Sequence, residues 1–285
     1  MMEITLGAKK GRGLDDLIGK YHPNPVEEAS RVLTLEKSIF VDLLEKYTKL
    51  KELLEYSDPE SWMKGESQYK KMSGITAVLN PQELRAFLSV LNIIEEKVVP
   101  HQGLFLTKLI QNSYDAGYNN FSLDHEDKAI IHVGSFLRGR EDNPLTMNIE
   151  KARGLFYAHG AEYINMTVEV SVFGYAERIR NSSLTILGDA ATGLGRRSFR
   201  TAFHVTGDTH GDLAEYARES SYLLDGEFKT APSKRWIRDS APQQCTFKSP
   251  RPATVDTLLD YIPSGNRIVL IHADGREEIV RDYND

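Results

Sequence analysis

The sequence predicts an α+β protein: a helical N-terminal part, then a short parallel β-helix (a solenoid) of about 19-residue turns, then a C-terminal helix and β-hairpin. Apolar residues recur at helical spacing up to Gly117 and alternate at a spacing of two after it. Between Glu169 and Gly226 the chain can be laid on itself at a period of 19 residues. We divide it into a helical domain (1–118), a β-helix domain (119–253) and a helix-plus-hairpin cap (254–285).

Composition narrows the class of protein. The chain has 285 residues, 40% of them hydrophobic, a net charge of −6 and one cysteine, Cys245, so no internal disulfide forms. The negative charge disfavours a surface dominated by attraction to phosphates, so we expect no nucleic-acid partner. No apolar run approaches the roughly 20 residues that span a bilayer, and none of signal-peptide length occurs at the N-terminus. We therefore expect a cytoplasmic protein without membrane contact.

The first segments are a lead-in and a helix. Residues 1–31 are predicted to be a loosely structured end with a small solvated basic cluster. Residues 34–56 are predicted to be helical, because one face gathers apolar residues at steps of three and four, namely Phe40, Leu43, Tyr47, Leu50 and Leu54. That face packs on another helix of the same chain or, in the alternative, forms an intermolecular coiled coil.

The next helices have clear end signals. Asn80 is a suitable N-cap, Pro81 a suitable first helical residue, and Glu83 completes a capping box. Pro100 stops this helix, and the apolar stretch 104–114 predicts another that ends before Gly117. We expect these helices to cover one end or flank of the solenoid.

After Gly117 the alternating segments 121–123, 130–133, 145–149 and 164–172 predict strands, some of them degenerate solenoid turns. The clearer repeat follows, with glycines in register at Gly188, Gly207 and Gly226. Before each lies a strand whose apolar residues form two columns: Leu184, Phe203 and Tyr222 in one, and Ile186, Val205 and Leu224 in the other. Units this short bury their apolar faces only by stacking. The alternative is a set of antiparallel hairpins.

The glycines Gly174, Gly188, Gly193, Gly195 and Gly207 around short apolar strands carry a resemblance. Residues 160–230 resemble the glycine-punctuated β-helix of the glutamate synthase C-terminal domain and of the formylmethanofuran dehydrogenase C subunit. The resemblance implies a structural, interface-forming role and supplies no catalytic residue.

The C-terminal segments complete the prediction. Residues 231–253, which contain four prolines, are interpreted as a covering loop. A short helix from about Thr254 to Tyr261, a strand 267–271, a turn at Asp274-Gly275 and a strand 278–283 follow. The hairpin is expected to cap the open end of the solenoid, which would otherwise expose unpaired backbone groups.

Stacked turns would bring charged residues together. One column has alternating charge and supports stacking: Glu177, Arg196 and Glu215. Two neighbouring columns form what we call the arginine strip: Arg178, Arg197 and Tyr216 in one, and Arg180, Phe199 and Arg218 in the other. The arginine strip and the adjacent charge column are the candidate ligand-binding surface, and the arginines have the chemistry to bind a carboxylate or phosphate group. Its candidate residues are Arg178, Arg180, Arg197, Glu177, Arg196 and Glu215. The alternative is solvated charge pairing.

A second candidate is a metal or proton-transfer site at the Gly207 corner, formed by His204, His210 and Asp208 with Asp212. Residues 188–195 superficially resemble a phosphate-binding loop but lack its Lys-Ser or Lys-Thr.

No catalytic residue or cofactor is identified. The sequence therefore favours a non-enzymatic structural or interaction module, with itself or another protein as partner. The alternative is an enzyme or ligand-binding protein that recognises an anionic small molecule or metal on the solenoid.

Overall fold

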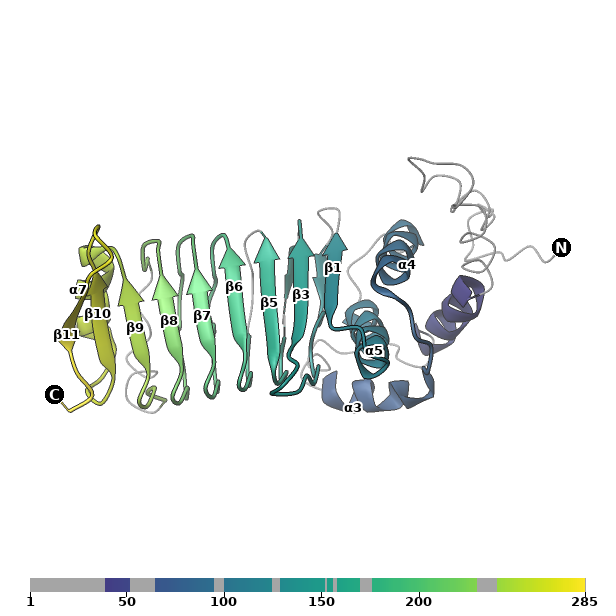
Figure 1. Ribbon diagram of the computed structural model, residues 1–285, viewed down its shortest axis with the longest axis horizontal. Coiled ribbons are helices and arrows are strands. Elements are labelled where there is room, and N and C mark those ends of the chain that lie inside the picture. The colour runs from purple at the N-terminus through teal and green to yellow at the C-terminus, as the bar shows by residue number, and fades with distance from the viewer. Residues whose placement is uncertain are drawn as a thin grey trace.

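The computed structural model describes residues 39–51, 65–94, 100–124, 129–151, 153–155, 158–169, 176–229 and 240–284. The expected lead-in (1–31) lies outside these ranges, as do Gly174 and parts of the helix 34–56 and of the covering loop. Figure 1 shows a row of strands, with the N-terminal helices gathered at one end and α7 at the other.

The helical segment 39–51 packs within the chain. Its predicted apolar face is buried at Phe40, Leu43, Tyr47 and Leu50. The ring centroid of Phe40 lies 5.4 Å from that of Phe87, and the ring centroid of Tyr47 lies 5.3 Å from that of Phe105. This face is therefore covered by other helices of the same chain, the first of the two predicted alternatives.

The other described N-terminal helices are α3 (Gly65–Lys71), the 3-10 helix η2 (Met72–Gly74), α4 (Pro81–Ile94) and α5 (Pro100–Asp115). The capping box of α4 is confirmed: the Glu83 amide donates to Asn80 Oδ1 at 2.9 Å, and the Asn80 amide donates to Glu83 Oε2 at 2.7 Å. Beyond α5, Gly117 has a φ of +108°, which suits the left-handed residue after a helix.

The strands form one sheet whose spatial order follows the chain. They are β1 (Asn120–Asp124), β3 (Leu145–Glu150), β5 (Ile164–Glu169), β6 (Ser183–Leu187), β7 (Ala202–Val205), β8 (Ser221–Leu224), β9 (Thr246–Ser249), β10 (Arg267–Ile271) and β11 (Glu277–Arg281). Neighbours pair in parallel from β1 to β10, and β11 pairs antiparallel with β10. A second small sheet pairs β2 (Ala129–Ile131) with β4 (Arg153–Leu155). The hairpin alternative for the repeat is therefore wrong.

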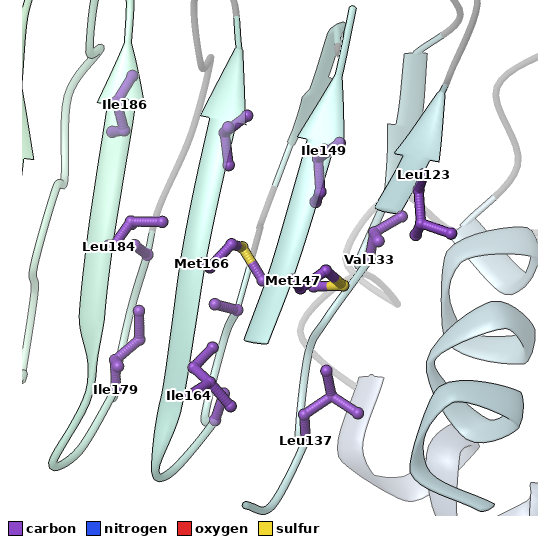
Figure 2. Packing of buried hydrophobic residues seen from close by; sticks show 14 of the residues in the cluster. Leu123, Val133, Leu137, Met147, Ile149, Ile164, Met166, Ile179, Leu184 and Ile186 are labelled. Atoms are coloured by element: carbon purple, nitrogen blue, oxygen red, sulfur yellow. The ribbon is translucent and has the colours of Figure 1, made fainter. Parts of the chain in front are cut away.

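The predicted columns are confirmed. Leu184 pairs with Phe203, and Phe203 pairs with Tyr222, in adjoining parallel strands. The column extends back through Met166 and Met147, so the earlier strands are turns of the same solenoid. Figure 2 shows Met147, Met166 and Leu184 of this column pointing into a common interior. Stacking thus buries a continuous core that no single turn could bury.

The glycine column is explained by close approach of successive turns and not by left-handed backbone angles. Neither Gly207 nor Gly226 has a positive φ. A Cβ on Gly226 would instead lie 2.0 Å from the Gly207 carbonyl oxygen, so close approach of successive turns requires glycine there. Left-handed backbone occurs at non-glycine corner residues such as Arg178, Arg197 and Tyr216, with φ of 60°, 55° and 56°.

The C-terminal end contains one strand that was not predicted. Residues 246–249, expected to be loop, form β9, which continues the parallel sheet between β8 and β10. Helix α7 (Pro252–Tyr261) begins two residues before the expected Thr254, and the β10–β11 hairpin is confirmed. Within the ranges given above, no helix combines the length and the apolar character needed to cross a bilayer.

Candidate functional site

In the alternating charge column, Arg196 pairs within the column and Glu177 pairs with the column beside it. Arg196 Nε lies 2.8 Å from Glu215 Oε2, as its place in the column predicts. Glu177 pairs with the neighbouring column instead: its Oε1 lies 3.3 Å from Arg197 Nη1 and 3.7 Å from Arg178 Nε. Because all these groups are at least partly exposed, each pair contributes little to stability.

The two columns of the arginine strip are present as predicted. Parallel bridges join Arg180 to Phe199 and Phe199 to Arg218. In the other column the Arg197 guanidinium lies over the Tyr216 ring, 5.5 Å from its centroid. Successive members of a column are neighbours on successive turns, about 4.8 Å apart.

A pocket of about 390 Å³ opens where α3 meets this face of the solenoid. Helix α3 supplies one wall, and successive solenoid turns supply the other. We call it the α3 pocket, and its lining residues are Glu66, Tyr69, Lys70, Phe136, Arg138, His159, Gly160, Glu162, Arg178 and Arg180. Two arginines of the predicted strip thus line a pocket that the sequence did not predict.

Aromatic rings form one part of its lining. The Phe136 ring centroid lies 5.7 Å from that of Tyr69 on α3 and 5.4 Å from that of His159. A Cβ on Gly160 would lie 3.1 Å from the Phe136 ring, so glycine leaves room for this packing. Burial, with the negative charge of Asp115 adding to it, raises the pKa of Tyr69 to about 12. The Tyr69 phenol is therefore a neutral hydrogen-bonding group at physiological pH.

The charges of the pocket are unevenly compensated. Lys70 pairs with Glu66 at 2.9 Å, and Arg138 pairs with Glu162. Arg178 has only the longer contact with Glu177, which Arg197 shares. No carboxylate in the described ranges lies within ion-pair distance of Arg180. The α3 pocket therefore presents an uncompensated guanidinium beside three further cationic side chains.

His159 lies at the inner side of the pocket and is mostly buried. Its Nδ1 is 3.8 Å from Glu177 Oε2. Burial lowers the pKa of His159; the Glu177 charge opposes this effect, and the Arg178 charge adds to it. Since an ordinary histidine titrates near pH 6.5, the imidazole is neutral at pH 7. It can then donate or accept a hydrogen bond without adding a positive charge.

Two of the predicted metal-binding residues, His204 and Asp208, have other partners. His204 Nε2 contacts Asp225 Oδ2 at 2.7 Å, whereas Asp208 pairs with Lys229 and accepts the Glu227 amide. In the parts of the chain that the structure describes, no three His, Cys, Asp or Glu side chains are grouped as metal ligands. The metal site at His204, His210 and Asp208 stays a prediction.

A second hollow, of about 510 Å³, lies on the adjacent edge of the solenoid. Its lining is largely hydroxyl and amide side chains, including Asn165, Asn181 and Ser183. The arginine there, Arg200, is already bound to Glu219 at 2.8 Å. This compensation makes the α3 pocket the better candidate for an anionic ligand.

Several pocket residues were not singled out in the sequence, chiefly Tyr69, Phe136, Arg138 and His159. Parallel bridges place Arg138, Glu162 and Arg180 in one column. The 19-residue period, extended backward from Arg180, reaches Ala161 instead of Glu162, because this turn is one residue shorter than the repeat. The repeat therefore did not indicate this part of the lining. Nothing in the sequence relates α3 to this column.

Comparison of the chain with protein-family models, with curated proteins and with solved structures finds no match. The candidate function therefore rests on the geometry of the α3 pocket and the arginine strip.

Proposed function

We propose that this protein is a non-enzymatic interaction module that binds an anionic group in the α3 pocket. The observation that carries the proposal is Arg180, an exposed arginine at a pocket, without a carboxylate partner in the described ranges. Arginine presents a planar fork of donors that matches carboxylate and phosphate oxygens. Arg178, Arg138 and Lys70 add positive charge to the same pocket.

The lining favours a ligand with an anionic group and an adjacent less polar part. The aromatic rings of Tyr69 and Phe136 provide apolar contact area, while the arginines provide charge-assisted hydrogen bonds. The solenoid contributes a rigid wall, since each corner residue is held by hydrogen bonds to the next turn; the Arg178 amide, for example, donates to the Arg196 carbonyl at 2.8 Å. A wall fixed in this way costs little ordering on binding.

Two further parts of the proposal concern the whole protein. The resemblance of residues 160–230 to the glutamate synthase and formylmethanofuran dehydrogenase β-helices supports an interface-forming role. We also propose a cytoplasmic location and contact with a second copy or another protein. Imaging of a fluorescent fusion tests the location, and membrane association would contradict it. Light scattering of the purified chain tests the second copy: a monomer would exclude self-association and leave another protein as the partner, and failure of affinity purification to recover any protein with that monomer would contradict the interaction role.

The anion-binding proposal is tested by titration calorimetry with inorganic phosphate, pyrophosphate and citrate. For whichever of these anions binds, replacing Arg180 by Gln should raise the dissociation constant at least tenfold, because a hydrogen bond to a charged group contributes roughly 1.5–3 kcal/mol. Arg276→Gln, which removes the same charge from the exposed β10–β11 turn, is the matched control and should leave affinity within twofold. Equal losses in both variants would mean that only overall charge matters and would refute the pocket.

A further inference from the structure

The arginine strip continues from the α3 pocket onto open solenoid surface. Arg178 and Arg180 line the pocket. Arg197 lies one turn farther in the column of Arg178, and Arg218 lies two turns from Arg180. With turns about 4.8 Å apart, Arg180 and Arg218 are separated by roughly 10 Å along the solenoid. The pocket is thus one end of a linear cationic surface.

This surface carries excess positive charge. In the described ranges, the four arginines of the strip share a single carboxylate, Glu177, which contacts Arg178 and Arg197. Arg180 and Arg218 are both exposed, and neither forms an ion pair there. Two uncompensated guanidiniums therefore flank Phe199 in one column.

The aromatic residues of the strip favour a peptide over a nucleic acid. Single-stranded nucleic acids are held largely by stacking of bases on exposed aromatic faces. Here the Arg197 guanidinium already lies over Tyr216, and the Arg200 guanidinium lies over Phe199 at 4.7 Å from its centroid. Tyr216 is 43% exposed, but the Arg197 guanidinium occupies one face of its ring. The four arginines of the strip are all exposed, and their linear spacing suits carboxylates on an extended chain.

We propose that the ligand is an extended acidic peptide segment of a partner protein. This inference rests on the anion site proposed above. One carboxylate of the peptide binds at Arg180 in the α3 pocket, and another binds at Arg218. In a polyproline-II conformation, residues three apart lie on the same side, about 9.3 Å along the chain, close to the separation of the two arginines. The peptide therefore lies along the solenoid axis across Phe199.

The test uses three labelled synthetic peptides and fluorescence anisotropy with the full chain. The first, EPPEPPE, places a glutamate at every third residue; the second, EPPQPPQ, keeps one glutamate; the third, PPEEEPP, clusters three. The first should bind at least tenfold more tightly than the second and several-fold more tightly than the third. Arg218→Gln should remove most of the advantage of EPPEPPE while leaving EPPQPPQ unchanged, and Arg276→Gln should alter neither.

Other outcomes separate the two proposals. If EPPEPPE and EPPQPPQ bind alike, or Arg218→Gln has no effect, the extended ligand is refuted, while the pocket stands if Arg180→Gln still weakens both peptides. If Arg180→Gln leaves EPPQPPQ binding unchanged, the pocket itself is refuted. Tighter binding of a ten-nucleotide oligothymidylate than of EPPEPPE would show that the ligand is a nucleic acid. Unchanged thermal unfolding of Arg218→Gln ensures that a loss of binding is not a loss of fold.

Discussion

The stacked positions Gly188, Gly207 and Gly226 are glycines because successive turns approach too closely there to leave room for a side chain. The Gly207 amide donates to the Gly188 carbonyl at 3.0 Å, and a Cβ on Gly207 would lie 2.5 Å from the Gly188 carbonyl carbon. The regular glycine spacing therefore reports contact between turns. A single glycine would have been ambiguous in sequence, but three at the same period indicated stacking.

His159 makes stability depend on pH. Burial lowers its pKa in the folded protein, whereas in the unfolded chain it titrates near pH 6.5. Between these values the unfolded state binds a proton that the folded state does not, so the free energy of unfolding falls as the pH falls below about 6.5. His159→Gln should show a shallower decline between pH 7.5 and 5.5 in urea unfolding. Parallel curves for the two proteins would contradict the buried, neutral imidazole.

At the scale of the element, strands β7, β8 and β9 each contribute one aromatic ring to the shared column. Phe203, Tyr222 and Phe247 stack with ring centroids 4.9 and 5.0 Å apart. The Tyr222 hydroxyl lies 3.1 Å from the buried Ser198 hydroxyl. Ring packing and this buried polar contact therefore hold β7, β8 and β9 together.

Replacing Tyr222 should separate these two contributions. Tyr222→Ala removes the central ring and should lower the free energy of unfolding by about 3–5 kcal/mol, the range for large-to-small changes in a core. Tyr222→Phe keeps the ring and removes the hydroxyl, so it should cost only about 1 kcal/mol. Denaturant unfolding measures both. A loss for Tyr222→Phe as large as that for Tyr222→Ala would show that the hydroxyl contact, and not the stack, dominates.

The predictability of each element follows from how local its signal is. The α4 capping box and strands β6 to β8 have signals within a few residues or at a fixed period, and the sequence revealed them. Strand β9 was missed because Phe247 follows its partner Tyr222 by 25 residues instead of 19, which breaks the period. Helix α3 lacks an apolar run, and the α3 pocket depends on its packing against distant turns. Arg178 and Arg180 were predicted, but their pocket was not.

At the scale of the whole molecule, the two ends of the sheet are finished differently. At one end α4 packs on β1 and α5 on β2. At the other, β11 is the last strand, and Ile279 and Val280 are 53% and 40% exposed. Figure 1 shows this contrast between a helix-covered end and an edge strand. The interior strands, with paired neighbours on both sides, form the most protected part of the sheet.

Hydrogen exchange should reveal this gradient. The amides of β6, β7 and β8 should exchange slowest, because opening them requires separation from two neighbouring strands. The amides of β11 should exchange at least tenfold faster, since one edge of that strand has no partner strand in the described sheet. Mass spectrometry of peptides covering 183–224 and 277–281 measures the difference. Equal protection of the two regions would indicate that β11 is covered in solution.

The parallel register also governs how the molecule could change in size. A second copy of residues 188–206 inserted after Thr206 would carry its own glycine, core and corner residues, so every inter-turn contact could form again. Arg180 and Arg218 would then lie three turns apart instead of two. Tyr222 and Phe247 pair although 25 residues separate them, so strands β8 and β9 keep their parallel register over an interval longer than the repeat. For the acidic peptide proposed above, whole-turn duplication would therefore lengthen the spacing of carboxylates that fits Arg180 and Arg218, while both ends of the solenoid keep their own contacts.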